Sequence, residues 1–141
     1  MDGKRVSDLC LLAGRFAICR LPADDAVPAW AAGGPFSSIT RTSDELSIVC
    51  AEGLAPAGSP GEGGWRVFQV AGPLDFSLTG ILAAIASPLA KAGVSIFAVS
   101  TFLTDYILVK EENLASAVEA LRTAGHSVVG ASPRSARGSG K

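Results

Sequence analysis

Hydroxyl and carboxylate side chains gather at two places in the second half of the chain. Ser100, Thr101, Thr104 and Asp105 lie between the apolar runs VSIFAV and YILV, and Asp75 lies in the loop GPLDFSLTG that leads into an apolar helix. The first amides of a helix have no intrahelical partner, so they suit a carboxylate. Asp75, Thr101 and Asp105 can accept hydrogen bonds from an ammonium group. Together these residue types supply the minimal recognition chemistry of a free α-amino acid.

The same residues also have an ordinary structural explanation. Ser77 or Thr79 can act as the N-cap of the helix, Asp75 can close a turn, and Asp105 can close a hairpin. Spacing alone favours this capping explanation. Gly80 is compatible with both, because a residue without a side chain also lets a ligand approach the backbone.

The residues that usually carry acid–base catalysis are scarce. The single histidine, His126, follows a helix C-terminus, and we interpret it as a surface cap favoured by the negative end of that helix. Glu111 and Glu112 precede a helix, where compensation of the positive dipole end explains them. No nucleophile–base pair, phosphate loop or metal-ligand motif occurs in a suitable setting. We therefore expect no catalytic residues, no metal, no cofactor and no enzymatic activity.

Composition indicates a globular intracellular protein. The 141 residues are 48% hydrophobic and 18% charged, and the net charge of −1 gives no general attraction to nucleic acid. Cys10, Cys19 and Cys50 each lie in an apolar run and form no CxxC pair, so we expect buried reduced thiols. No apolar run reaches the length of a membrane span. These features predict a cytoplasmic protein with no membrane association.

Apolar periodicity and turn residues predict the elements. Residues 9–21 suggest two short strands broken at Gly14, and residues 36–51 suggest a hairpin around Thr42-Ser43-Asp44. The second half predicts a strand at 66–71, a helix from about 79 to 92 that Pro88 should kink or divide, strands at 94–100 and 105–110, a helix capped by Asn113, and a strand at 127–129.

This second half has the order βαββαβ, with a weak internal echo between LAKAGVSI at 89–96 and LRTAGHSV at 121–128. Two βαβ halves on one antiparallel sheet form the ferredoxin-like arrangement. In that topology residues 94–100 form an apolar edge strand, which we expect the first half of the chain or another subunit to cover.

Residues 8–130 resemble the ACT-domain superfamily. The run STFLTDYILVKEEN and the preceding helix and strand are similar to the tandem ACT-like proteins related to the cytosolic arginine sensors of eukaryotes, and FAICRL, PAW and FSSITRTSDELSIVC resemble the bacterial members. The resemblance implies an α+β protein of two side-by-side ACT-like domains, each an antiparallel sheet with helices on one face.

The expected domain organisation has five parts. A disordered N-terminus at 1–7 is followed by a degenerate ACT-like half at 8–52, a flexible linker at 53–64 and an ACT domain at 65–130. The last part, 131–141, carries Arg134, Arg137 and Lys141 among glycine, serine and proline, which is typical of a disordered basic tail.

ACT-type domains bind amino acids or similar small effectors through the loop after the first strand and the facing edge strand. Carried over to this sequence, the resemblance implies the ligand-binding residues Asp75, Phe76, Ser77, Gly80, Ile81, Leu82, Thr101, Phe102 and Asp105. Arginine-binding relatives use acidic groups in the loop, whereas Phe76–Thr79 reads FSLT and has no acid. A neutral or apolar amino acid is therefore as compatible as arginine. Phe76 and Phe102 are equally compatible with lining a pocket and with core packing.

The resulting hypothesis is a non-catalytic amino-acid-binding regulatory or sensor module that forms a homodimer or higher homo-oligomer. Its partners would be a free amino acid or similar small effector, with neither nucleic acid nor membrane. The alternative is a structural protein–protein interaction domain whose ligand cleft is vestigial.

Overall fold

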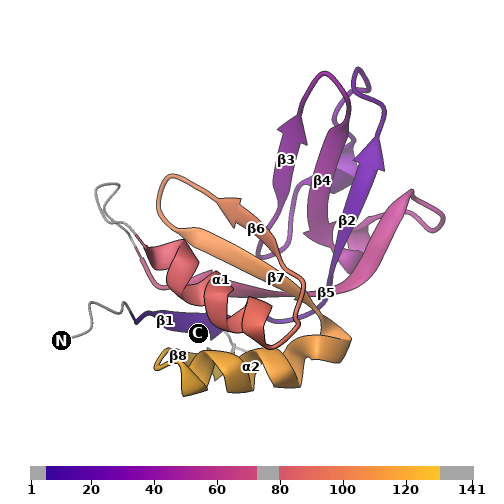
Figure 1. The fold of residues 1–141 in the computed structure, drawn as a ribbon. Helices are drawn as coiled ribbons and strands as arrows, with labels where there is room; N and C mark the ends of the chain where they lie inside the picture. The colour runs from indigo at the N-terminus through magenta and orange to yellow at the C-terminus, as the bar shows by residue number, and fades with distance from the viewer. Residues whose placement is uncertain (1–5, 73–79, 131–141) are drawn as a thin grey trace. The chain divides into compact units, whose positions relative to one another are not determined.

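The computed structural model describes residues 6–72 and 80–130 (Figure 1). The chain divides into two compact units, one formed by residues 1–13 together with 66–141 and the other by residues 14–65. Residues 73–79, which include Asp75, Phe76 and Ser77, lie outside the described residues. No helix in the described ranges combines the length and apolarity that a membrane span requires.

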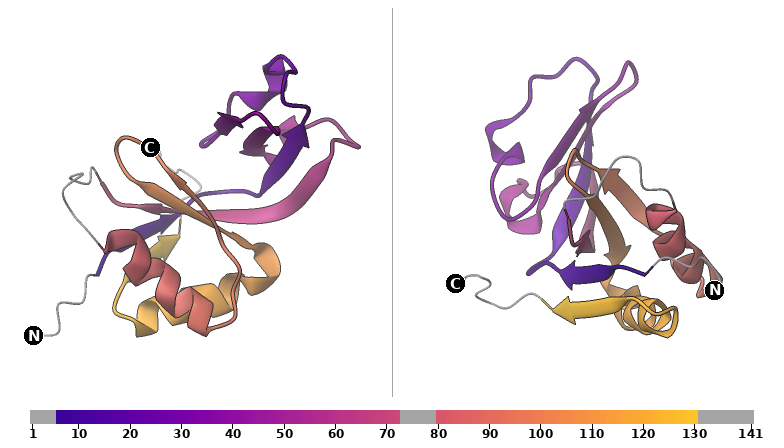
Figure 2. Two further views of the ribbon diagram at one scale, coloured as in Figure 1. Left: turned by 45° about the horizontal axis from the view of Figure 1, so that its top comes forward. Right: turned by 90° about the vertical axis from the view of Figure 1, so that its left-hand side faces the viewer.

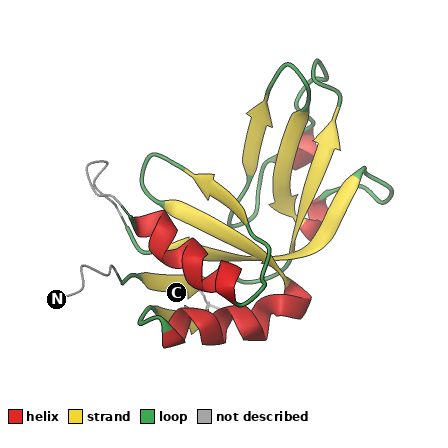
Figure 3. Cartoon of the chain, viewed as in Figure 1, coloured by secondary structure: helices red, strands yellow, loops and turns green. Residues whose placement is uncertain are grey.

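The unit that contains the C-terminal half has the predicted order of elements. β5 (Gly61–Val70), α1 (Ile81–Lys91), β6 (Phe97–Ser100), β7 (Asp105–Lys110), α2 (Leu114–Thr123) and β8 (Ser127–Gly130) follow one another along the chain. Both helices lie against one face of the sheet (Figure 3). They share one core with the strands, to which the following residues contribute: Leu9, Phe68, Val70, Ile85, Leu89, Val94, Ile107, Val109, Ala117, Leu121 and Val128.

An additional strand from the N-terminus separates β5 from β8. β1 (Asp8–Leu11) pairs with β5 in antiparallel register and with β8 in parallel register, so the strand order of this unit is β6-β7-β5-β1-β8. The sheet is therefore predominantly antiparallel rather than wholly antiparallel as expected. β1 and β2 (Phe16–Leu21), which the sequence predicts as neighbouring strands, belong to different units.

β6 lies at the edge of this sheet and pairs with β7, with Ser100 opposite Asp105. This placement confirms the expected edge position, although the strand covers residues 97–100 rather than the expected 94–100.

Helix α1 continues through Pro88, so of the two expected effects, a kink or a division of the helix, the division is wrong. A proline at position 88 has no amide hydrogen to donate to the carbonyl of Ala84 four residues earlier. The Nε2 atom of His126 lies 2.9 Å from that carbonyl oxygen and replaces the missing donor. His126 is only 3% exposed, so its interpretation as a surface cap is also wrong.

The unit formed by residues 14–65 is built from strands without an α-helix. Its strand order is β3 (Ser38–Arg41), β4 (Leu46–Ala51), β2 and the first residues of β5, with two short 3-10 turns at Ala29–Ala31 and Glu52–Leu54. The helix-covered sheet expected for the second ACT-like domain is therefore not seen in this unit.

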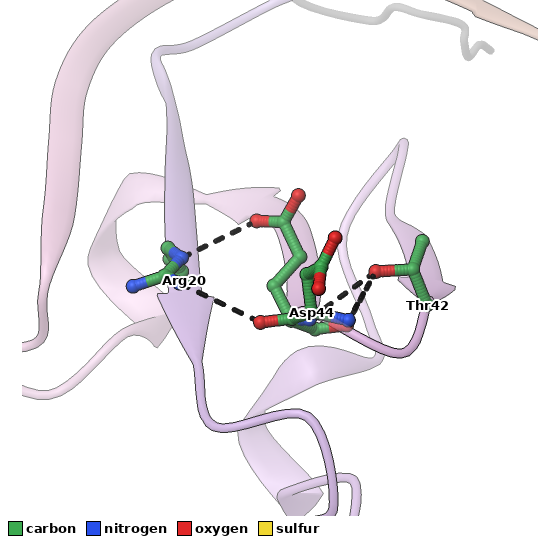
Figure 4. A network of polar contacts seen from close by, with 4 residues as sticks. Arg20, Thr42 and Asp44 are labelled. Atoms are coloured by element: carbon green, nitrogen blue, oxygen red, sulfur yellow. Dashed lines mark hydrogen bonds and ion pairs between the residues drawn. The ribbon is translucent and has the colours of Figure 1, made fainter.

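The predicted hairpin around Thr42 is confirmed. β3 and β4 pair in antiparallel register, and the amide of Thr42 donates to the carbonyl of Glu45 at 2.9 Å. The Thr42 hydroxyl oxygen accepts hydrogen bonds from the amides of Asp44 and Glu45, and the Arg20 guanidinium lies 3.6 Å from the Glu45 carboxylate (Figure 4). The turn is thus fixed by a threonine that satisfies two backbone donors.

Two cysteines lie in the core of this unit. The β2–β4 register pairs Ala17 with Cys50 and Cys19 with Ile48, so both thiols lie on one face of the sheet, and both are buried. They are free thiols, as the sequence predicts. Burial raises the pKa of both thiols, and the charge of a neighbouring Cys19 thiolate raises the pKa of Cys50 further.

These raised pKa values predict that stability falls in alkaline solution. Above about pH 8.5 the unfolded chain releases thiol protons that the folded chain retains, so the free energy of the unfolded state falls relative to that of the folded state as the pH rises. Urea titrations between pH 7 and 10 should therefore show a smaller fall for Cys19→Ala/Cys50→Ala than for the wild type. Cys10→Ala, which leaves both buried thiols in place, should keep the wild-type slope. Equal slopes for all three proteins would contradict the assignment.

Candidate functional site

The first cluster of expected site residues lies at the start of α1. Gly80 is the N-cap residue, with a φ of +81° that favours glycine, and its carbonyl accepts the first helical hydrogen bond from the amide of Ala84 at 2.9 Å. Among the described residues, no side chain forms a capping hydrogen bond at this helix end. The side chains of Ile81 and Leu82 pack against the core of the unit. This end of α1 therefore offers its backbone, rather than its first side chains, to a ligand.

The second cluster is the turn at residues 101–104 between β6 and β7. The Thr101 amide donates to the Thr104 carbonyl at 2.8 Å, and the Thr101 hydroxyl contacts the Thr104 carbonyl at 3.1 Å and the Thr104 amide at 3.3 Å. Asp105 accepts a hydrogen bond from the Ser100 hydroxyl at 2.6 Å. The hairpin-closing role that the sequence allows for Asp105 is thus present, and its carboxylate retains capacity for a further donor.

Phe102 and Leu103 occupy the tip of this turn. Phe102 is 77% exposed and Leu103 is 59% exposed. The core-packing explanation for Phe102 is therefore wrong. Two large apolar side chains at an exposed turn are available to contact a ligand or another protein surface.

Thr104, which belongs to the polar constellation but not to the expected ligand set, joins the turn to the rest of the site. Its side chain is buried, and its hydroxyl donates to the carbonyl of Val70 at 2.7 Å. Val70 is the last residue of β5 and precedes the loop that leads to α1. The buried hydroxyl therefore holds the turn against the strand end from which that loop leaves. The sequence shows a threonine between two apolar runs, which marks Thr104 as unusual. It does not show that the partner of Thr104 is a carbonyl 34 residues away.

The two clusters lie at the same end of the unit. The turn between β6 and β7 and the first residues of α1 lie on the same side of the unit in Figure 1, and Figure 2 gives two further views of the chain. The first amides of α1, which suit a carboxylate, and the hydroxyl and carboxylate groups of the turn, which suit an ammonium, therefore belong to one side of this unit. Within the described residues, no group of three or more metal-ligating side chains accompanies them.

Comparisons with known families match both units. Residues 61–123 match the family model described as the ACT domain, and a second model, described as an N-terminal domain, matches residues 14–57. The human protein named cytosolic arginine sensor for mTORC1 subunit 1 is 44% identical over 59 residues. That alignment covers 41% of this chain but only 18% of the sensor.

Comparison with solved structures extends the similarity to most of the chain. A protein from Agrobacterium tumefaciens with a known X-ray structure is 44% identical, covers 91% of this chain and 96% of its own, and superposes with a TM-score of 0.86. The regulatory subunit of aspartate kinase from Thermus thermophilus, at 13% identity, covers 84% of this chain and 94% of its own with a TM-score of 0.54, and shows similarity of fold alone. With the ACT-domain model, the element order and the sensor match in agreement, the chain belongs to the ACT-domain superfamily as a relative of the cytosolic arginine sensors.

Proposed function

We propose that this protein is a non-catalytic sensor or regulatory module that binds a free amino acid or a similar small effector. The observation that carries the proposal is the buried hydrogen bond from Thr104 to Val70, which fixes the polar turn beside the strand end that leads into α1. The name of the curated relative, an arginine sensor, supports the ligand class. We make this proposal for the whole chain. The alignment with the sensor covers only 18% of the sensor's length.

The proposed ligand lies between the start of α1 and the β6–β7 turn. Its carboxylate meets the amides that follow Gly80, and its ammonium meets Asp105 and the hydroxyl of Thr101. Ile81 and Leu82 contribute backbone, and Phe102 covers the ligand side chain. Asp75, Phe76 and Ser77, which lie outside the described residues, complete the set. Because FSLT supplies no acid at 76–79, a neutral or apolar amino acid fits as well as arginine.

We extend the proposal to the domain division and the assembly of the chain. The unit at 14–65 is the reduced member of a tandem ACT-like pair, within the organisation expected from the sequence: a half at 8–52, a linker at 53–64, a domain at 65–130 and a basic tail at 131–141. The protein works in the cytoplasm. It forms a homo-oligomer, in which the edge strand β6 meets another subunit.

A second candidate function is a protein–protein interaction domain whose ligand cleft is vestigial. The exposure of Phe102 and Leu103 favours it, since neighbouring apolar residues at an exposed turn are typical of contact surfaces. Ligand screening separates the two functions, because an interaction domain binds no free amino acid.

Screening by calorimetry and thermal unfolding against the twenty amino acids should identify at least one ligand with a dissociation constant below about 1 mM, or about −4.1 kcal/mol. At a ligand concentration 100 times that constant, the folded state should gain about 2.7 kcal/mol. If none of the amino acids binds more tightly than about 1 mM, the proposed function is wrong.

The charge of Asp105 is tested with Asp105→Asn. Asparagine keeps an acceptor oxygen for Ser100 but removes the negative charge, so a charge-assisted bond to the ammonium is lost and the dissociation constant should rise at least about tenfold. Glu112→Gln removes an exposed carboxylate from the 3-10 turn after β7 and should bind as the wild type does. Unchanged affinity in Asp105→Asn would remove Asp105 from the site.

The position of the turn is tested with Thr104→Val, which has nearly the same shape but no hydroxyl. The buried carbonyl of Val70 then loses its Thr104 partner, and the free energy of unfolding should fall by about 1–3 kcal/mol. Ser100→Ala removes an exposed hydroxyl from the last residue of β6, next to the turn, and should change the free energy of unfolding by less than about 0.5 kcal/mol. Urea titration measures both, and equal effects would show that Thr104 does not hold the turn.

A further inference from the structure

His126 joins three segments of the C-terminal unit through its two ring nitrogens. The amide of Ser7, just before β1, donates to Nδ1 at 3.0 Å, and Nε2 lies 2.9 Å from the carbonyl oxygen of Ala84 in α1. The histidine itself follows the C-terminal end of α2 and precedes β8 (Figure 1). An amide can only donate and a carbonyl can only accept, so this geometry fixes the neutral tautomer with hydrogen on Nε2.

The contact between Nε2 and the carbonyl of Ala84 compensates for a hydrogen bond that α1 lacks. Pro88 cannot donate to the carbonyl of Ala84, and a buried carbonyl without a partner costs about 1–3 kcal/mol. His126 provides the donor that residue 88 lacks. His126, which follows α2, therefore compensates for Pro88 in α1.

The internal echo in the sequence shows that packing alone does not require a histidine here. In the first copy, LAKAGVSI, the residue after the terminal glycine is Val94, and its amide donates to Leu89. In the second copy, LRTAGHSV, the equivalent residue is His126, and its amide donates to Leu121. Both side chains are buried, but only the second can pair with Ala84 and Ser7.

We propose that His126 is a proton-sensitive latch between α1 and the entrance of β1. A proton added to Nδ1 converts its acceptor into a donor that faces the amide of Ser7. We call the latch closed when Nδ1 accepts the hydrogen bond from the amide of Ser7. Because two donors cannot share a hydrogen bond, the latch cannot be closed while Nδ1 is protonated. Protonation of the ring therefore shifts the molecule towards an open latch, in which Nδ1 no longer accepts from the amide of Ser7.

The surroundings of the ring permit this exchange. His126 lines a groove of about 710 Å³ between α1 and α2, so solvent reaches the neighbourhood of the buried ring. The charged residues that line this groove are Lys91 on α1 and Glu119 on α2, both exposed. Asp8 on β1 and Arg122 on α2 belong to the elements that flank His126, and each has a partner of its own. Asp8 accepts a hydrogen bond from the Ser127 hydroxyl, and Arg122 donates to the carbonyl of Val128.

The latch also has a consequence for the ligand site, and this step rests on the proposed function. The carbonyl of Ala84 lies one helical turn after Gly80, where the proposed ligand carboxylate binds. Closing the latch holds α1 against β1, so an amino acid bound at the start of α1 favours the closed state. By reciprocity, acidification then weakens ligand binding.

The latch is tested without any ligand by nuclear magnetic resonance of the full chain. At pH 7.5 the nitrogen shifts of the His126 ring should identify the tautomer with hydrogen on Nε2. As the pH is lowered, the amide of Ser7 should lose protection from hydrogen exchange at least about tenfold, in step with protonation of the ring. His126→Val should lack this pH dependence. A ring with hydrogen on Nδ1, or a protonated ring with Ser7 still protected, would overturn the proposal.

The pairing with Pro88 is tested by a double-mutant cycle. His126→Val should raise the unfolding constant about 10-fold to 100-fold, because it leaves both Ala84 and Ser7 without partners. In a Pro88→Ala background, where residue 88 again carries an amide hydrogen, the same substitution should cost at least about fivefold less. Equal costs in the two backgrounds would contradict the pairing. If the latch is confirmed while no amino acid binds, the proposed function fails and the latch stands.

Discussion

The insertion of β1 into the sheet is the constraint on which the C-terminal unit depends. Four residues supply backbone partners to β5 on one side and to β8 on the other. The flanking contacts are made by the same segment: the carbonyl of Asp8 accepts from the amide of Ala71, and the carbonyl of Ser7 accepts from the amide of Ser127. Leu9, at the centre of β1, is 1% exposed in the shared core. Without β1, the edges of two strands and part of that core would be open to water.

The sheet determines the position of the candidate site. β1 fixes the last residues of β5, and the final carbonyl of β5, on Val70, receives the buried hydroxyl of Thr104. The polar turn is thereby held at a defined distance from the point where the chain leaves for α1. His126 adds a second connection, because it links the body of α1 to the residue that precedes β1. The two segments of the proposed ligand site, the β6–β7 turn and α1, are therefore each held by a hydrogen bond to a backbone carbonyl, on Val70 and on Ala84.

The sequence predicts local features well and distant partners poorly. The hairpin at Thr42, both helices of the C-terminal unit and the edge position of β6 follow from patterns within a few residues. The placement of β1 does not, because LCLL is as compatible with one sheet as with the other. The burial of His126 depends on partners 119 and 42 residues away, and spacing along the chain carries no signal for them. Of the nine expected site residues, Gly80, Ile81, Leu82, Thr101, Phe102 and Asp105 have described positions, whereas the ligand contact of all nine remains a proposal.

The central claim is that an amino acid binds between the start of α1 and the β6–β7 turn. The most direct measurement is a nitrogen–proton correlation spectrum of the labelled protein, titrated with an equimolar mixture of amino acids and then with each one alone. The account predicts saturable shift changes that cluster at the amides of residues 80–82 and 101–105. Saturable changes confined to residues 14–65, or no saturable change with any amino acid, would contradict it.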